Sequence, residues 1–92
     1  MNKILILTTK GCEACDIARH NITAAIVQCD RIDNIEVETK DWHDEKRDFI
    51  AAHKVKDFPT VFYMLDERVV SKSVGTYPIP VYVRWIDMYF KK

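Results

Sequence analysis

The 92-residue sequence has no charge imbalance and no long apolar segment. Its fourteen basic and fourteen acidic residues cancel, so there is no basic field to attract nucleic acid and no acidic surplus. No apolar run is long enough to span a bilayer, and the run after Met1 turns polar at Thr8, too early for the core of a signal peptide. We therefore expect a cytoplasmic protein that binds neither nucleic acid nor membrane.

Internal repeats and low-complexity linkers are also missing. Ninety-two residues are enough for one small domain, and a hydrophobic share of 48% is ample for its core. The sequence therefore predicts a single domain over residues 1–92.

Cysteine is scarce, and two of the three cysteines, Cys12 and Cys15, form the only Cys-x-x-Cys pair. A structural zinc site usually needs four ligands, often as two such pairs. Without a second pair, the possible additional ligands are Cys29, His20, His43 and His53. Three cysteines in a reducing compartment do not form a disulfide framework. Three interpretations of the pair follow: a redox site, a zinc site, or two inert core cysteines.

The sequence around the pair favours the redox interpretation. Residues 4–7 form an apolar run typical of a buried strand, Gly11 relieves the turn, and helical spacing begins at Ala14. Cys12 then lies at a helix N-terminus, which favours the thiolate, so we expect Cys12 to be exposed and to have a lower pKa than an ordinary cysteine. Cys15 lies one turn on, on the same face, within reach to resolve a mixed disulfide formed by Cys12.

Hydrophobic periodicity predicts seven elements along the chain. We expect strands at 3–8, 35–39, 61–65 and 69–74, and helices at 13–29, from a cap at Asp44 to about His53, and from Pro78 or Pro80 onward. The first helix predicts a right-handed crossover between two parallel strands, and the last two strands predict an antiparallel hairpin.

Each predicted helix has an apolar face. In the first helix this face comprises Ala14, Ile17, Ala18, Ile22, Ala25, Ile26 and Cys29, which makes Cys29 a buried apolar filler, with a free thiol at the helix end as the alternative. The second helix directs Phe49 and Ile50 inward, with His53 as a further candidate for its buried side. The last helix packs through Tyr82, Trp85, Ile86 and Tyr89, and its further apolar residues predict either a monomer or weak self-association through this helix.

With this order of elements, the whole chain resembles members of the thioredoxin-like superfamily, specifically the small thioredoxin and glutaredoxin-type proteins. Three motifs carry the resemblance: residues 11–15 after the first strand, Phe58-Pro59-Thr60 before the third, and Val74-Gly75 before the last helix. The resemblance implies an α/β fold with a four-stranded mixed sheet in the order 2-1-3-4. The first and last helices would cover one face of that sheet and the second helix the other.

The resemblance also implies that Pro59 is cis and faces the cysteine pair, leaving the backbone of Phe58 free to pair with an extended substrate segment. The alternative is a trans proline at the start of a strand. Members of the superfamily that resemble this chain act as thiol-disulfide oxidoreductases. The resemblance therefore implies thiol-disulfide exchange, a reaction that requires no cofactor.

The sequence departs from the thioredoxin pattern beside the cysteines. Thioredoxins usually carry tryptophan before the first cysteine and Gly-Pro between the two, whereas this chain has Lys10-Gly11 and Glu13-Ala14. The Glu13 carboxylate should disfavour the Cys12 thiolate, while Lys10 and the helix dipole favour it. Glu13 alternatively lies there only because acids are favoured in a first helical turn.

Two other departures concern proton transfer and glutathione. Ile6 stands about where thioredoxins have a buried aspartate that assists proton transfer. After Gly75, residues 76–80 lack the second glycine and the acidic residue that glutaredoxins use to bind glutathione.

We therefore interpret the chain as an oxidoreductase that reduces disulfides in protein partners, with no metal and no cofactor. Cys12 would attack, Cys15 would resolve, and Phe58 and Pro59 would bind the partner. A thioredoxin reductase-like enzyme or glutathione would re-reduce the pair. The alternatives are a glutaredoxin that uses glutathione, and a non-catalytic binding module whose cysteines hold zinc or are inert.

Overall fold

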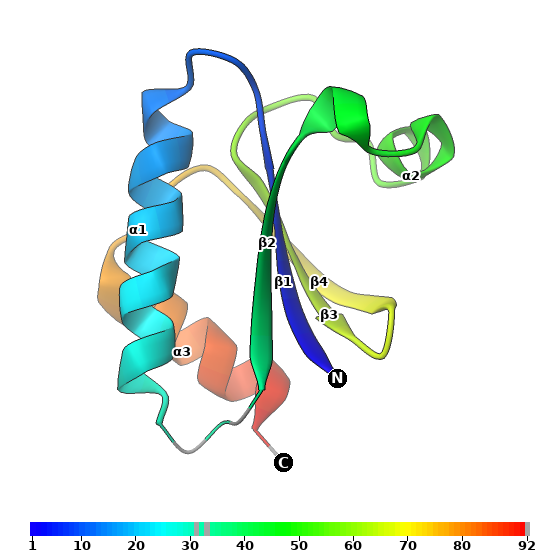
Figure 1. Cartoon of the computed structure of the whole chain (residues 1–92). Coiled ribbons are helices and arrows are strands. Elements are labelled where there is room, and N and C mark those ends of the chain that lie inside the picture. The colour runs from blue at the N-terminus through cyan, green and yellow to red at the C-terminus, as the bar shows by residue number, and fades with distance from the viewer. Residues whose placement is uncertain (31, 33, 92) are drawn as a thin grey trace.

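The computed structural model describes residues 1–30, 32 and 34–91. Four strands form one mixed sheet in the order β2-β1-β3-β4, with β1 parallel to β2 and the other two pairings antiparallel. The strands are β1 (Asn2–Thr8), β2 (Ile35–Asp41), β3 (Thr60–Leu65) and β4 (Arg68–Val74). The predicted strand order and the predicted crossover are therefore confirmed (Figure 1).

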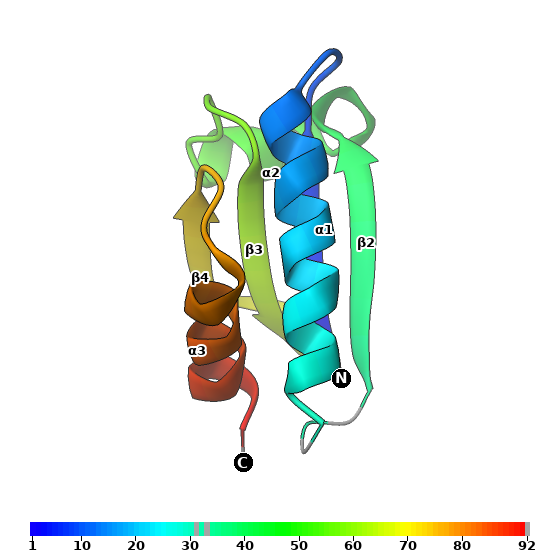
Figure 2. The same ribbon diagram turned by 90° about the vertical axis from the view of Figure 1, so that its left-hand side faces the viewer.

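The helices lie on both faces of the sheet. Helices α1 (Glu13–Gln28) and α3 (Ile79–Phe90) cover one face, and α2 (Arg47–Ala52) covers the other (Figures 1 and 2). The four consecutive aliphatic residues of β1 alternate between two cores, because successive side chains of a strand point to opposite faces. Ile4 and Ile6 pack beneath α1 and α3, and Leu5 and Leu7 pack beneath α2.

The buried face of α1 is rotated relative to our prediction. Ala14 is exposed and Ile17 is 53% exposed, so both were wrongly assigned to the core. The buried residues are Cys15, Ala18, Ile22 and Ala25, and Cys29 follows at the C-cap. These positions are three or four residues apart and form one stripe, whereas Ala14 and Ile17 each precede a member of that stripe by one residue, about 100° around the helix.

The start of α2 also differs from the prediction, in which Asp44 capped the helix. Asp44 instead ends a short 3₁₀ helix, η1 (Trp42–Asp44), and α2 begins at Arg47 without a side-chain cap. The reason lies in the neighbouring acids: the Asp41 carboxylate accepts a hydrogen bond from the His43 N–H at 2.9 Å, and the Glu45 carboxylate accepts one from the Lys46 N–H at 2.9 Å. These bonds satisfy backbone donors before the longer helix can start.

Helix α3 begins after Pro78 and has Pro80 in its first turn, as predicted. Its buried residues are Tyr82, Ile86 and Phe90, and the ring of Trp85 contacts Tyr63 edge to face. Met88, at 60%, is the large apolar side chain that this helix leaves exposed among the described residues. Self-association through α3 therefore stays a prediction, with little apolar surface to support it. Among the residues described, no helix combines the length and apolar character needed to cross a membrane.

Candidate functional site

Three loops meet at the end of the sheet where β1 ends, β3 begins and β4 ends (Figures 1 and 2). The loop from β4 to α3 contacts both the proline loop, which precedes β3 and contains Pro59, and the first turn of α1. Its Gly75 N–H donates to the Pro59 carbonyl at 2.9 Å, and its Thr76 hydroxyl donates to the Ala14 carbonyl, between the two cysteines, at 2.7 Å. The structure therefore ties together all three motifs that the sequence singled out.

Cys12 and Cys15 form a disulfide across the first turn of α1, with their Cα atoms 5.3 Å apart. Gly11 takes a positive φ of 75° before the helix, a conformation that glycine adopts without steric cost. Cys12 is the N-cap, and its Sγ accepts a hydrogen bond from the Cys15 N–H at 3.1 Å. Cys12 is half-buried, whereas Cys15 is 2% exposed. Cys12 is therefore the more exposed residue of the pair, as its position in the sequence predicted.

The third cysteine lies outside this site. Cys29 is free and 8% exposed, and its thiol contacts the Val83 carbonyl at 3.7 Å. Burial raises the pKa of the Cys29 thiol, and the charges of Asp87 and Asp30 raise it further. The prediction of a buried filler is confirmed, and a thiol held in its protonated form is a poor nucleophile.

The possible zinc ligands are dispersed. His53 packs against Phe49 and Phe62, at ring-centroid distances of 4.4 and 5.2 Å, and His43 packs against Trp42 at 3.9 Å. In residues 1–30, 32 and 34–91, no three His, Cys, Asp or Glu side chains group closely enough to hold a metal ion.

The loop before β3 contains the proline motif and contacts the β4–α3 loop through the Gly75–Pro59 hydrogen bond. The Phe58–Pro59 peptide bond is cis, as the resemblance implied, and the Pro59 side chain is fully buried. The Phe58 ring is half-buried, 6.2 Å from the Trp42 ring. Within the described residues, the Phe58 backbone makes no hydrogen bond. An unpaired backbone segment can pair with an incoming extended chain.

Charged residues adjoin Cys12 in the sequence, and some of them line a hollow that includes both cysteines. Lys10 and Glu13 are both exposed and flank Cys12, where the sequence placed them. Asp16 and Arg19, which sequence analysis did not single out, line a hollow of about 340 Å³ that reaches Cys15. Ile6, at the position compared with a buried aspartate, is fully buried in the core beneath α1 and α3.

Sequence analysis also missed Thr76 and Trp42. Residues 76–80 were considered only for the glutathione-binding residues that they lack. The signal for Thr76 was its hydroxyl group next to Gly75. Trp42 follows a predicted strand and lies in a polar stretch. The signal for Trp42 was the presence of a single large aromatic residue among polar ones.

No protein-family model matches the chain, and no curated protein sequence matches it. Solved structures do match. A thioredoxin mutant from Halobacterium salinarum is 20% identical with a TM-score of 0.76, and the match covers 99% of this chain and 76% of that one. A thioredoxin-2, described as a component of the malaria parasite protein secretion machinery, is 15% identical with a TM-score of 0.74, covering 96% and 82%. Chloroplastic thioredoxin z is 14% identical with a TM-score of 0.72, covering 97% and 78%.

The chain has the thioredoxin fold. The likeness at these identities concerns the fold, and the chemistry follows from this chain's own residues. In this example of the thioredoxin fold, the cysteine pair, the cis proline and the glycine after β4 lie at one end of the sheet. Gly75 is hydrogen-bonded to Pro59, and Thr76 next to it is hydrogen-bonded to Ala14 between the cysteines.

Proposed function

We propose that this chain is a thiol-disulfide oxidoreductase that reduces disulfides in protein partners. The observation that carries the proposal is the cysteine pair at the N-terminus of α1, in which a half-buried cysteine and a buried cysteine are joined in a disulfide. In this arrangement one cysteine can meet a partner while the other stays protected for the second step.

The reaction begins with the reduced pair. The Cys12 thiolate attacks one sulfur of the partner's disulfide, that bond breaks, and the partner's other sulfur leaves as a thiolate and takes up a proton. Cys15, deprotonated, then attacks the Cys12 sulfur and expels the partner's first sulfur as a second thiolate. The partner gains two electrons and two protons, and the Cys12–Cys15 disulfide forms.

The position of Cys12 supports its role as the nucleophile. It caps a helix of 16 residues, where the helix dipole favours an anion, and the Cys15 N–H at 3.1 Å points at its sulfur. Cys15 is 2% exposed, so an external disulfide meets Cys12 first.

Phe58 and Pro59 are proposed to bind the partner, with Lys10 and Glu13 modulating the Cys12 thiolate. The unpaired Phe58 backbone supports pairing with an extended partner segment that contains the attacked cysteine. Either a thioredoxin reductase-like enzyme or glutathione is proposed to re-reduce the pair.

The direct test is reduction of insulin with dithiothreitol as the electron donor. We expect turbidity from the released insulin chains to appear earlier with the protein than with dithiothreitol alone. Limiting iodoacetamide added to the reduced protein should label Cys12 before Cys15 or Cys29, as read by mass mapping. First labelling of Cys15 or Cys29 would contradict the assignment of the nucleophile. Activity only with glutathione and its reductase would identify a glutaredoxin instead.

Thr76 is expected to be a positioning residue for this reaction. Thr76→Val keeps the size of the side chain but removes the donor to the Ala14 carbonyl, so the turn between the cysteines loses one restraint. We expect kcat/KM for insulin to fall about three- to tenfold, in keeping with the loss of about 1 kcal/mol that one hydrogen bond contributes. Thr76→Ser retains the hydroxyl and should restore most of the rate. Equal rates for Thr76→Val and Thr76→Ser would contradict this role.

A further inference from the structure

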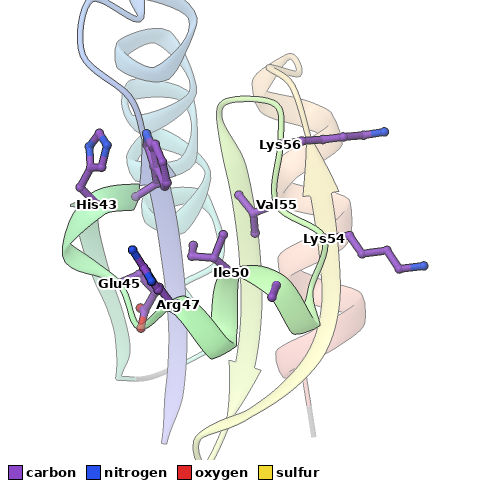
Figure 3. A pocket seen from close by; sticks show the side chains of 9 residues that line it. His43, Glu45, Arg47, Ile50, Lys54, Val55 and Lys56 are labelled. Atoms are coloured by element: carbon purple, nitrogen blue, oxygen red, sulfur yellow. The ribbon is translucent and has the colours of Figure 1, made fainter.

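An apolar hollow of about 680 Å³ lies on the α2 side of the sheet. Its apolar lining comes from three segments: Trp42 of η1, Ile50 and Ala51 of α2, and Val55 of the loop that follows. Figure 3 shows Ile50 and Val55 pointing into the space between α2 and this loop. A hollow of this size is large enough for a large side chain together with part of its backbone.

The charged groups on its rim are mostly basic. Arg47, Lys54 and Lys56 line the hollow and form no ion pair with any residue that the structure describes. In Figure 3, Lys54 and Lys56 extend outward on the side away from His43. Three exposed cations beside apolar surface leave a positive field that a partner with acidic groups can neutralise.

The single acid in the lining is already engaged. The Glu45 carboxylate accepts hydrogen bonds from the Lys40 ammonium at 3.3 Å and from the Lys46 N–H at 2.9 Å. The other acids between residues 41 and 57 are Asp41, Asp44, Asp48 and Asp57, and none of them lines the hollow. The Asp41 carboxylate is engaged by the His43 ring at 3.1 Å. The lining therefore favours anions.

The hollow adjoins the segment proposed to bind partners. Trp42 forms its wall, and the Trp42 ring lies 6.2 Å from the ring of Phe58, the residue before Pro59. An extended chain advances about 3.3 Å per residue, so a segment paired with Phe58 reaches the Trp42 ring within a few residues.

We propose that this hollow docks an acidic segment of the disulfide-bearing partner, anchored by one large apolar side chain. The proposal rests on the proposed function, because the docked segment belongs to the polypeptide whose cysteine Cys12 attacks. The apolar side chain would fill the space between Trp42, Ile50 and Val55, and acidic residues next to it would face Lys54 and Lys56. The site would therefore select among disulfide proteins by sequence near the cysteine.

Peptides closed by an internal disulfide test the proposal. The three flanking sequences are Trp-Glu-Glu, Ala-Glu-Glu and Trp-Lys-Lys, each placed in turn before and after the ring. Second-order rate constants are measured in single-turnover reactions with the reduced protein, quenched with acid and quantified by mass spectrometry. We expect Trp-Glu-Glu to react about tenfold faster than Trp-Lys-Lys at low salt, with Ala-Glu-Glu in between, in at least one placement.

Charge reversal identifies the surface responsible. Lys54→Glu/Lys56→Glu should abolish or invert the ratio between the acidic and basic peptides, because the rim then repels the acidic flank. Arg84→Glu/Lys91→Glu changes the net charge equally, but from exposed positions in and just after α3, on the other face of the sheet, and should retain the ratio. Loss of the ratio in both variants would show a general charge effect and overturn the proposal.

The remaining outcomes test the docking site separately from the proposed oxidoreductase function. If the wild type reduces all peptides at the same rate, the docking site is wrong and the proposed function stands. If no peptide is reduced, both are wrong. Loss of the preference on addition of millimolar phenylacetate would identify a site for small anions, and loss of the preference with rising protein concentration would identify a second copy as the occupant; either would overturn the proposal.

Discussion

The Cys15→Ser variant is expected to stop halfway through the reaction and to accumulate as a mixed disulfide with its partner. Cys12 still attacks, but the buried residue three positions on no longer has a thiol to displace the partner. Cys12→Ser removes the first step, so turnover of insulin should fall by at least about 10³-fold. Non-reducing electrophoresis and intact mass spectrometry distinguish the trapped complex from the inactive variant.

Cys29→Ala is the matched control for these variants. Cys29 is also a cysteine on α1's buried side, at its C-cap, but its thiol contacts a backbone carbonyl of α3 and has a raised pKa. Its replacement should leave turnover intact and cost some stability because it creates a small cavity. Trapping of a partner by the Cys12→Ser variant, or full turnover by Cys15→Ser, would refute the assigned order of attack.

The second large effect is expected in the reduction potential of the pair. Glu13 is the first residue of α1 and is exposed, so its carboxylate adds negative charge next to Cys12 and weakens the stabilisation of the thiolate. A less stable thiolate makes the pair a better reductant. We expect a potential nearer to the thioredoxin value of about −270 mV than to the strongly oxidising value of about −120 mV.

Glu13 variants give the sign of this effect. Glu13→Gln should raise the potential, and Glu13→Lys should raise it further, by tens of millivolts in total, since about 30 mV corresponds to 1.4 kcal/mol for a two-electron couple. Glu67→Gln removes the same charge from the turn between β3 and β4, at the other end of the sheet, and should leave the potential unchanged. Equilibration with glutathione that gave a wild-type potential above about −180 mV would reverse the proposed direction of exchange.

The sequence predicted the elements well where side-chain pattern and backbone chemistry agreed. Residues 4–7 are aliphatic without interruption because β1 is buried on both faces, and the turn at Asp66 and Glu67 is short enough to allow only a hairpin. Pro78 and Pro80 fit a helix start because the first turn leaves backbone donors unused. Each of these signals depends only on residues close together in the sequence, so each can be recognised without the structure.

Predictions failed where two local solutions compete or where the outcome depends on distant residues. The apolar residues of α1 fit two helix faces, and packing against the sheet selected the one with Cys15 over the one with Ile17. The carboxylates of Asp41 and Glu45 satisfy backbone donors that Asp44 was expected to cap. No local pattern marks Thr76 as a partner of Ala14, 62 positions away.

The two faces of the sheet are covered unequally, and this affects where local unfolding costs least. The face with the larger core lies under helices of 16 and 12 residues, whereas the other lies under a helix of six. Local unfolding costs least where few apolar contacts must break. The proline loop and Trp42 border the thinly covered side, while the cysteines belong to the longest helix. We therefore expect the segments proposed to bind a partner to open locally at a lower free-energy cost than α1, which carries the cysteine pair at its N-terminus.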